Sequence, residues 1–310
     1  MRLLSNLFDI IIILLPFICV LLAIGFFTLF ERKILAAVII RKGPNKVGYI
    51  GLMQPFRDAG KLFCKEFVMP DRANLLPFIV APSLILGLSL RLWLLYPIKF
   101  VDIVFVFGVL QFLVTASVRV FGVIIAGWAS NSKYALLGSV RRIAQSISYE
   151  IPFSLILFTI TILMLTFIIQ EIILWQDSFF ILCFLYLRGM RLWLISMLAE
   201  NHRAPFDFVE GESELVSGFN VEFRGGGFAI IFMSEYRRIM FRRFVTSTLF
   251  FGGREIIVSV FSLCFIYFFV WIRGTFPRIR YDKLINLGWT VFSVVPLVML
   301  LGFILISFSV

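Results

Sequence analysis

The stretch Leu7–Phe30 reads LFDIIIILLPFICVLLAIGFFTLF, and Asp9 is its only charged residue. A helix needs about 20 mostly apolar residues to cross the hydrocarbon core of a bilayer, so this stretch is long enough. It is also longer than the apolar core of a secretory signal peptide and lacks a small-residue cleavage site. We therefore expect a retained first membrane span.

The rest of the chain has the same character. Of its 310 residues, 61% are hydrophobic and only 15% are charged, and the mean hydropathy is +1.01. The apolar runs are continuous rather than alternating, which excludes a β-barrel. We predict an all-α polytopic membrane protein that forms one transmembrane domain over residues 1–310. About eight spans are expected, near residues 7–30, 75–96, 100–128, 145–169, 178–200, 227–251, 255–274 and 285–308.

Two connections between the predicted spans are long, residues 31–74 and 201–226. The first is too charged to cross a membrane, and Gly51–Phe67 mixes apolar with charged side chains. This pattern predicts an amphipathic helix that lies at the membrane interface. Such a helix is either a surface anchor or one wall of a binding site at the membrane boundary.

Basic residues are distributed unevenly between the two sides of the predicted membrane. Residues 31–74 alone carry nine Lys and Arg, whereas the opposite side has chiefly Arg2, Lys99 and Arg254. Both termini are therefore expected to face away from the basic, cytoplasm-like or matrix-like side. We attribute the net charge of +11 to these flanking loops and not to nucleic-acid binding.

The cysteines and the single histidine do not form a pattern typical of a metal or redox centre. Cys19, Cys64, Cys183 and Cys264 are scattered and include no CxxC pair. We therefore expect no metal, haem or iron–sulfur cluster in this chain. Any electrons would have to come from a partner.

Carboxylates stand where the membrane makes them costly. Glu150, Glu200 and Glu235 lie in or at the ends of predicted spans, and a charge at the centre of a spanning helix costs about 2.5–3.5 kcal/mol. Each could form a structural ion pair, for instance Glu235 with Arg238. Crowded carboxylates in a low dielectric instead share protons, which suits a proton relay.

The second long connection adds more acid: Asp207, Glu210, Glu212, Glu214 and Glu222. If Pro205 opens a helix, three of these carboxylates share one face. The triplet Gly225–Gly227 would then form a flexible exit. Taken alone, an acid-rich loop is more often simply solvated.

Four stretches resemble subunit 1 of respiratory complex I, the proton-pumping NADH:quinone oxidoreductase. The most specific is AENHRAPFDFVEGESELVSGFNVEF, at 199–223. The others are ERKILAAVIIRKGPNKVGYIGLMQPFRDAGKLF (31–63), GWASNSKYALLGSVRRIAQSISYE (127–150) and IRGTFPRIRYDKL (272–284). Together they cover the basic-side loops, and the eight-span plan agrees along nearly the whole chain.

The resemblance implies a membrane-arm subunit that cradles ubiquinone together with peripheral iron–sulfur subunits and contacts neighbouring membrane-arm subunits and lipids. NADH, FMN and iron–sulfur clusters would belong to partners. The implied proton-relay residues are Glu150, Glu200, Asp207, Glu210, Glu212, Glu214, Glu222 and Glu235. The implied quinone-side residues are Glu31, Arg32, Arg41, Gln54, Asp58, Phe228, Phe232 and Arg280.

Two further readings of the resemblance stay open. The chain could be the related coupling subunit of a membrane-bound hydrogenase, or a passive membrane anchor for peripheral subunits. The expected location is the mitochondrial inner membrane, with a bacterial plasma membrane as the alternative.

The chain also departs from the family. Asn201–His202 replaces the usual Thr-Asn, so His202 is either a proton carrier or a substitution that hydrogen-bonds the loop. Surplus arginines occur in or beside spans: Arg91, Arg119, Arg188, Arg191, Arg237, Arg238, Arg242 and Arg243. Arg188 and Arg191 could snorkel, and the four between 237 and 243 could bind lipid headgroups or acidic partners. Arg119 has no explanation from the sequence.

Overall fold

The computed structural model describes residues 2–96, 105–176, 186–207, 218–252 and 255–309, and all regular structure in these ranges is helical. This confirms the all-α class. The helices in the first half of the chain are α1 (Arg2–Val38), α2 (Gln54–Phe63), α3 (Leu75–Trp93), α4 (Gly108–Ala129), α5 (Lys133–Met164) and α6 (Ile169–Trp175). Those in the second half are α8 (Leu187–Glu200), α10 (Gly226–Phe251), α11 (Glu255–Thr275), α12 (Tyr281–Leu287) and α13 (Val294–Ser309).

Six of the eight expected spans are helices long and apolar enough to cross a membrane: Leu15–Val38, Leu75–Trp93, Gly108–Ala129, Lys133–Met164, Ile256–Thr275 and Tyr281–Leu305. The other two are α8 and α10. The described part of α8 has 14 residues. Helix α10 has 26 residues but carries Glu235 and several arginines, so its charge and not its length distinguishes it from the six.

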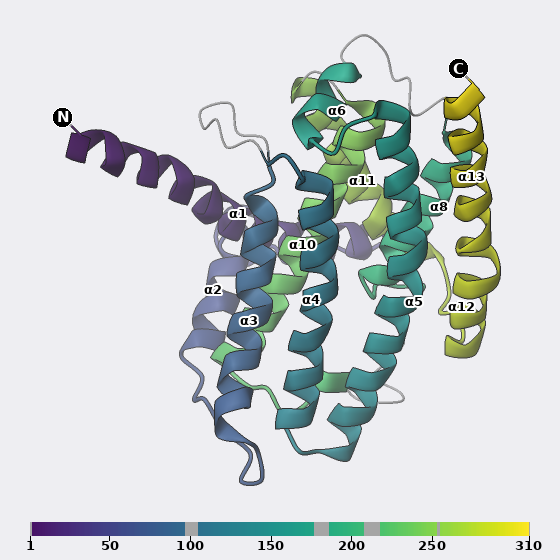
Figure 1. Cartoon of the computed structure of the whole chain (residues 1–310). Coiled ribbons are helices and arrows are strands. Elements are labelled where there is room, and N and C mark those ends of the chain that lie inside the picture. Colours follow the sequence, from purple (N-terminus) through teal and green to yellow (C-terminus); the bar gives the residue numbers. More distant parts are fainter. Residues whose placement is uncertain (1, 97–104, 177–185, 208–217, 253–254, 310) are drawn as a thin grey trace.

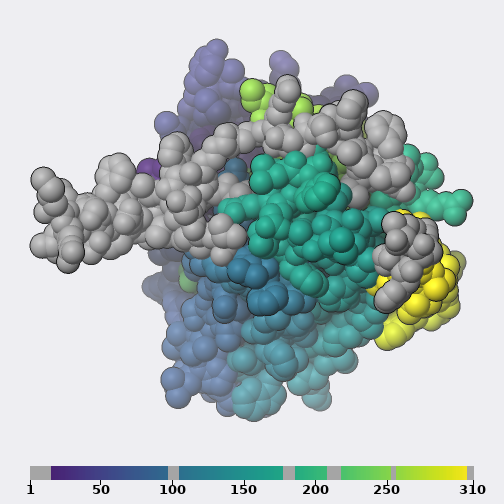
Figure 2. Space-filling model, turned by 45° about the horizontal axis from the view of Figure 1, so that its top comes forward, coloured from purple at the N-terminus to yellow at the C-terminus, as the bar shows by residue number. Residues whose placement is uncertain are grey.

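The helices form a bundle around α5 and α10. Helices α3, α4 and α5 lie side by side, α10 packs against α3 and α11, and α13 packs against α5 (Figure 1). Figure 2 shows the teal-green middle of the chain packed beside the yellow C-terminal helix. The start of α1 extends away from the bundle (Figure 1), while its second half contacts α2, α10 and α11.

Aromatic side chains fill the core between these helices. Phe153 of α5 stacks on Trp193 of α8 with ring centroids 4.2 Å apart, and both are fully buried. The ring centroid of Phe112 of α4 lies 5.6 Å from that of Phe153 and 5.9 Å from that of Phe241 of α10. Burial of such large apolar rings holds α8 and α10 in place despite their charges.

Helix α5 begins earlier than expected. It starts at Lys133 and not near residue 145, so Glu150 lies in its middle and does not begin the span. Between Lys133 and residue 145 the weakest helix former is Gly138, and its lack of a side chain allows close packing. A Cβ there would lie 2.8 Å from the Cα of Gly218, so glycine allows the 218–219 backbone to touch α5.

Two expectations for the second long connection are wrong. Helix α10 already begins at Gly226, so the glycine triplet is not a flexible exit. Gly225 precedes it at φ +56°, a left-handed conformation that suits glycine,. Pro205 does not open a helix at residues 205–207, and its carbonyl accepts a hydrogen bond from the backbone N–H of Ile279 at 3.1 Å. The expected shared face of three carboxylates lies mostly outside the described residues.

Helix α2, predicted as an interfacial amphipathic helix, has both faces expected of one. Gln54 is buried, whereas Phe56 and Phe63 are 50% and 58% exposed. The buried side faces α1 and α10, which α2 contacts. The exposed phenylalanines leave an apolar face on the outside of the bundle.

Candidate functional site

The carboxylate of Glu31, near the end of α1, joins four parts of the chain. One of its oxygens, Oε1, accepts hydrogen bonds from Arg203 Nη1 at 2.6 Å and from Arg273 Nη1. Its other oxygen, Oε2, accepts one from the hydroxyl of Tyr236 at 2.8 Å. Glu31 is only 4% exposed. Its charge is therefore compensated by two guanidiniums and a hydroxyl, which buried charges require.

An aromatic column runs along α10 beside this carboxylate. Phe228, Phe232 and Tyr236 follow at i, i+4 spacing, so they lie on one face of the helix. Ring centroids are 6.0 Å apart for the first pair and 4.4 Å for the second. The guanidinium of Arg203 lies over the ring of Tyr236, 4.5 Å from its centroid. The column thus begins at the charged group around Glu31 and continues as an apolar wall.

A second carboxylate lies on α2, which contacts both α1 and α10. Asp58 accepts hydrogen bonds from Arg32 Nη1 at 2.6 Å and from Gln54 Nε2 at 2.8 Å. Arg32 follows Glu31 directly on α1, so the two acidic groups are linked through adjacent residues. Asp58 is 34% exposed and remains accessible from outside the chain.

The structure places six of the eight predicted quinone-side residues in two groups on contacting helices: Glu31, Phe228 and Phe232 on α1 and α10, and Arg32, Gln54 and Asp58 on α1 and α2. The other two do not join them through any contact of the described residues. Arg41 is exposed, and Arg280 is 80% exposed and pairs with Asp282 at 3.0 Å.

The carboxylates predicted to relay protons lie deeper in the bundle. Glu200 ends α8 at 1% exposed; its Oε1 contacts Arg242 Nη2 and lies 3.3 Å from Arg119 Nη2. Glu235 pairs with Arg142 of α5 at 2.5 Å, so the predicted pairing with Arg238 is wrong.

Glu150, in contrast, has a neutral partner. Its Oε1 accepts a hydrogen bond of 2.5 Å from Ser117 Oγ. It is half-buried in the middle of α5, and no described guanidinium forms a salt bridge with it.

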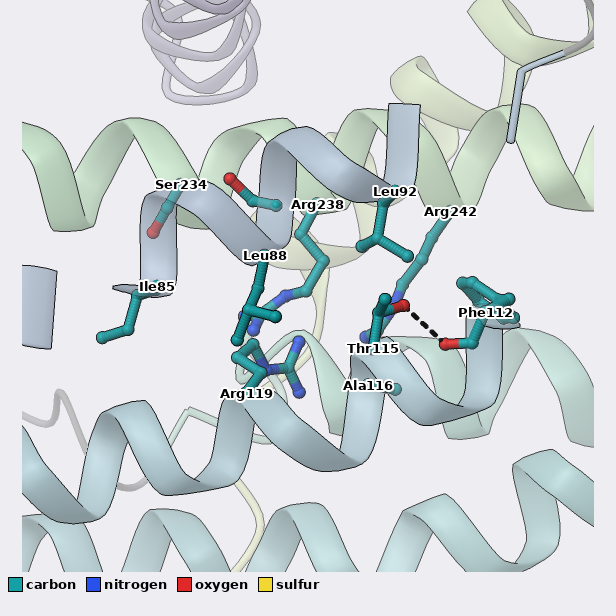
Figure 3. A pocket seen from close by; sticks show the side chains of 11 residues that line it. Ile85, Leu88, Leu92, Phe112, Thr115, Ala116, Arg119, Ser234, Arg238 and Arg242 are labelled. Carbon is teal, nitrogen blue, oxygen red and sulfur yellow. Dashed lines mark hydrogen bonds between the residues drawn. The ribbon is translucent and has the colours of Figure 1, made fainter. Parts of the chain in front are cut away.

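Arg119, unexplained by the sequence, lies among all three of these carboxylates. Besides its contact with Glu200, it interacts electrostatically with Glu150 and Glu235. Figure 3 shows Arg238 and Arg242 pointing from α10 toward Arg119 on α4, across a small pocket whose lining is mostly apolar but also includes Thr115 and Ser234. The three membrane carboxylates therefore share one electrostatic neighbourhood between α4, α5, α8 and α10.

The four α10 arginines point inward. Arg237, Arg238, Arg242 and Arg243 are between 0% and 4% exposed. The prediction that they bind lipid headgroups or acidic partner subunits is therefore wrong, because their guanidiniums do not reach the surface. Arg188 and Arg191 are exposed, as snorkelling requires.

A tight turn after α8 carries His202 and Arg203. Gln145 of α5 is fully buried, and its Nε2 donates to the carbonyl oxygens of Ala199 and Phe206, at 2.9 Å each. The backbone N–H of Phe206 donates to the carbonyl of Arg203 at 2.8 Å. Gln145 thus ties together the two ends of the turn that places Arg203 against Glu31.

His202 is buried inside this turn at φ +50° and is 3% exposed. Its Nδ1 has no hydrogen-bond partner among the described residues. Burial, with Arg142, Arg238 and Arg119 nearby, holds the pKa of His202 well below its usual 6.5. A neutral imidazole follows, which disfavours the proton-carrier hypothesis near neutral pH.

The remaining acidic residues are placed less completely. Asp207 is buried at 9% exposed, and Glu222 is half-buried. Glu210, Glu212 and Glu214 lie outside the described residues, as do Cys183, Lys99 and Arg254. Within the described ranges, no group of histidine, cysteine and acidic side chains could hold a metal ion.

Sequence reasoning missed Arg203, Arg273, Tyr236 and Gln145 as site residues. A signal existed for Arg273, a basic residue in the last turn of the apolar helix α11. Gln145 gave no signal, since its role depends on two carbonyls more than 50 residues away.

Comparison with known proteins places these features in a family. The model of the NADH dehydrogenase family matches residues 10–304. NADH-ubiquinone oxidoreductase chain 1 of Mytilus edulis is 55% identical over 288 residues, which cover 93% of this chain and 94% of that protein. The same-named chains of Heterololigo bleekeri and Aedes aegypti are 48% and 46% identical, each over 94% of this chain.

Proposed function

Because the chain belongs to the NADH dehydrogenase family and is a multi-pass membrane subunit of complex I, we propose that it forms one wall of the quinone-binding tunnel and couples quinone reduction to proton translocation. Peripheral iron–sulfur subunits complete the tunnel and supply electrons to ubiquinone. Neighbouring membrane-arm subunits receive the coupling signal, in the mitochondrial inner membrane.

The quinone wall is supported by the mixture of side chains on α1, α2 and α10. Phe228 and Phe232 offer an apolar surface to a quinone ring or tail, Asp58 offers an accessible carboxylate on neighbouring α2, and Glu31 lies buried at the Tyr236 end of the column. Binding pockets commonly combine apolar walls with a few placed polar groups. Asp58 is accessible at 34% exposed, so a partner subunit or substrate can reach it.

The proton relay is supported by Glu200, Glu235 and Glu150 around Arg119. Adding or removing one proton in such a cluster changes the electrostatic energy of the others, because their interactions are weakly screened in a buried site. Protonation of one carboxylate therefore favours proton release from another. Ser117, on Glu150, can both donate and accept a hydrogen bond and so can follow that change.

The single observation that carries the proposal is the turn between the two groups. Arg203 binds Glu31 on the quinone side at 2.6 Å, and it lies three residues after Glu200 on the relay side. Gln145 bonds both ends of this turn, so the backbone of the turn is fixed relative to α5. When quinone reduction changes the charge near Glu31, the side chain of Arg203 moves in response and alters the surroundings of Glu200.

The quinone wall is tested in the purified complex with a quinone-site inhibitor. We expect Asp58→Asn and Phe232→Ala to weaken inhibitor binding, while Asp71→Asn, which removes an exposed carboxylate, leaves it unchanged. Equal binding in all variants would refute the wall.

The relay is tested separately with the Glu200→Gln variant. We expect it to lower the number of protons translocated per electron, compared with a Glu66→Gln control on the exposed surface. Unchanged coupling would reduce the chain to a passive membrane anchor.

A further inference from the structure

We propose that Tyr236 and Arg203 are positioning residues that act on quinone by holding the carboxylate of Glu31 in one orientation. This rests on the proposed function, because the quinone site is what gives that orientation a purpose. Neither residue needs to touch quinone. Their effect passes through Glu31.

The two oxygens of Glu31 have different partners. Oε1 accepts from two guanidiniums, and Oε2 accepts from the hydroxyl of Tyr236 at 2.8 Å. Rotation of the carboxylate about its last bond away from this angle would break the hydrogen bonds to both kinds of donor. Charge-assisted hydrogen bonds of this type have strong geometric preferences, so the group is held at a defined angle.

Tyr236 is itself held on three sides. Its ring lies edge-on to Phe27, with centroids 5.3 Å apart, and against Phe232 at 4.4 Å. The guanidinium of Arg203 covers a ring face at 4.5 Å, a cation–π arrangement. The ring is 6% exposed. Its hydroxyl therefore cannot leave Glu31 without disturbing α1, α10 and the turn together.

Arg203 has two roles in this arrangement. Its guanidinium both binds Glu31 and covers Tyr236, while its backbone belongs to the turn that Gln145 fixes. The orientation of Glu31 is thereby tied to the end of α8. Replacing the planar, multiply donating guanidinium by a lysine ammonium should therefore affect quinone binding even though the positive charge is retained.

The test is a double-mutant cycle in the purified complex, with the KM for a short-chain ubiquinone and kcat as readouts. We expect Tyr236→Phe, Arg203→Lys and Glu31→Gln each to raise KM, by about tenfold for the loss of one hydrogen bond to a charged group. The double variant Tyr236→Phe with Glu31→Gln should match Glu31→Gln alone, because tyrosine acts through the carboxylate. Tyr134→Phe, at an exposed tyrosine, is the control.

Each result of this experiment decides something. If Glu31→Gln leaves KM unchanged, the proposed quinone wall fails at this residue. If Glu31→Gln raises KM but Tyr236→Phe does not, or if their effects multiply, the positioning proposal is overturned and the quinone wall stands. Should Glu31→Gln not assemble, Glu31→Asp takes its place in the cycle.

A different observation concerns position 237, in the middle of α10. Arg237 is fully buried, and its Nε, Nη1 and Nη2 all lack a hydrogen-bond partner among the described residues. A guanidinium carries five donors and stays charged, and buried charges are normally paired. Because this chain alone buries the side chain completely, neither a lipid nor a partner subunit can reach it. Arginine does not fit this position.

A small polar residue does fit it. Arg243, one and a half turns further along α10, also leaves Nε and Nη1 without hydrogen bonds. Helix contacts in membranes favour small residues such as serine. Serine also satisfies its own hydroxyl within a helix, as Ser234 does on the carbonyl of Ile231 at 2.6 Å.

We infer that the chain made in the cell carries serine at position 237. The codons AGA and AGG specify arginine in the standard genetic code but serine in the mitochondria of many invertebrates. The similar chains of Mytilus edulis and Aedes aegypti come from invertebrates. A gene that uses such a codon at position 237 would encode a neutral side chain there.

Peptide mass spectrometry of the native complex, digested with chymotrypsin, tests this directly. We expect the residue mass of serine at position 237, and an arginine mass there would overturn the inference. The same peptides report positions 238, 242 and 243. Arg203 and Arg273 are the controls: both are paired with Glu31 and must have the residue mass of arginine.

Discussion

One substitution should loosen the turn after α8, and the two hydrogen bonds that it removes set the expected free-energy cost. Gln145→Leu retains much of the buried volume but removes the amide that bonds the carbonyls of Ala199 and Phe206. Gln145 is fully buried, so water cannot readily replace it. A hydrogen bond lost at a buried group costs about 1–3 kcal/mol, and we expect about 2–4 kcal/mol for the pair because the turn can partly relax.

This loss should appear as faster local opening of the turn. Since every 1.4 kcal/mol is a factor of ten, the expected cost predicts amide hydrogen exchange about 30-fold to 800-fold faster at residues 202–206. The N–H groups of His202 and Phe206, bonded within the turn to Ala199 and Arg203, are the reporters. Exchange is measured by mass spectrometry on the purified complex.

The matched control is Gln111→Leu on α4. Its side chain is half-buried and makes no hydrogen bond with another described residue. We expect it to leave exchange in the turn unchanged. If Gln145→Leu exchanges within about threefold of the wild type, or if both variants behave alike, then Gln145 does not fix the turn.

Three further outcomes test the same region and the core. Glu31→Gln leaves two guanidiniums without their carboxylate and should destabilise the chain by about 3 kcal/mol. This is the low end for a broken buried pair, because Arg273 is 37% exposed,. An unchanged melting midpoint of the complex would contradict this. The pKa of His202 is lowered in the folded chain, so as pH falls through about 6.5 the unfolded chain binds a proton that the folded chain does not, and stability drops. His202→Asn, which tolerates the left-handed backbone, should reduce that drop, and thermal melting at pH 7.5 and 5.5 checks it. Trp193→Ala should cost about 3–5 kcal/mol, whereas Trp175→Ala, at a side chain that is 64% exposed, should cost little; similar losses of subunit stability for both would count against the stacked core.

The amino-acid sequence alone determined the class of this protein and most of its span plan. Membrane spans can be read locally, because about 20 apolar residues in a row suffice to cross a bilayer. The interfacial helix and the concentration of acid after α8 are local in the same sense. The start of α5 differs from the sequence-based boundary, because apolar periodicity marks only the membrane-spanning part of this helix and its polar first turns pack on the 218–219 backbone at Gly138.

The tertiary structure decided which charges meet. Glu31 lies 172 and 242 residues from Arg203 and Arg273, and Glu235 lies 93 residues from Arg142. Helical periodicity relates only residues three or four apart, so it suggested Arg238 as the partner of Glu235 and could not suggest α5. Long-range packing likewise made Gln145 the clamp of the turn and left Arg237 buried without a hydrogen-bond partner among the described residues. A sequence shows where charges are costly, but only the folded bundle shows which of them are compensated.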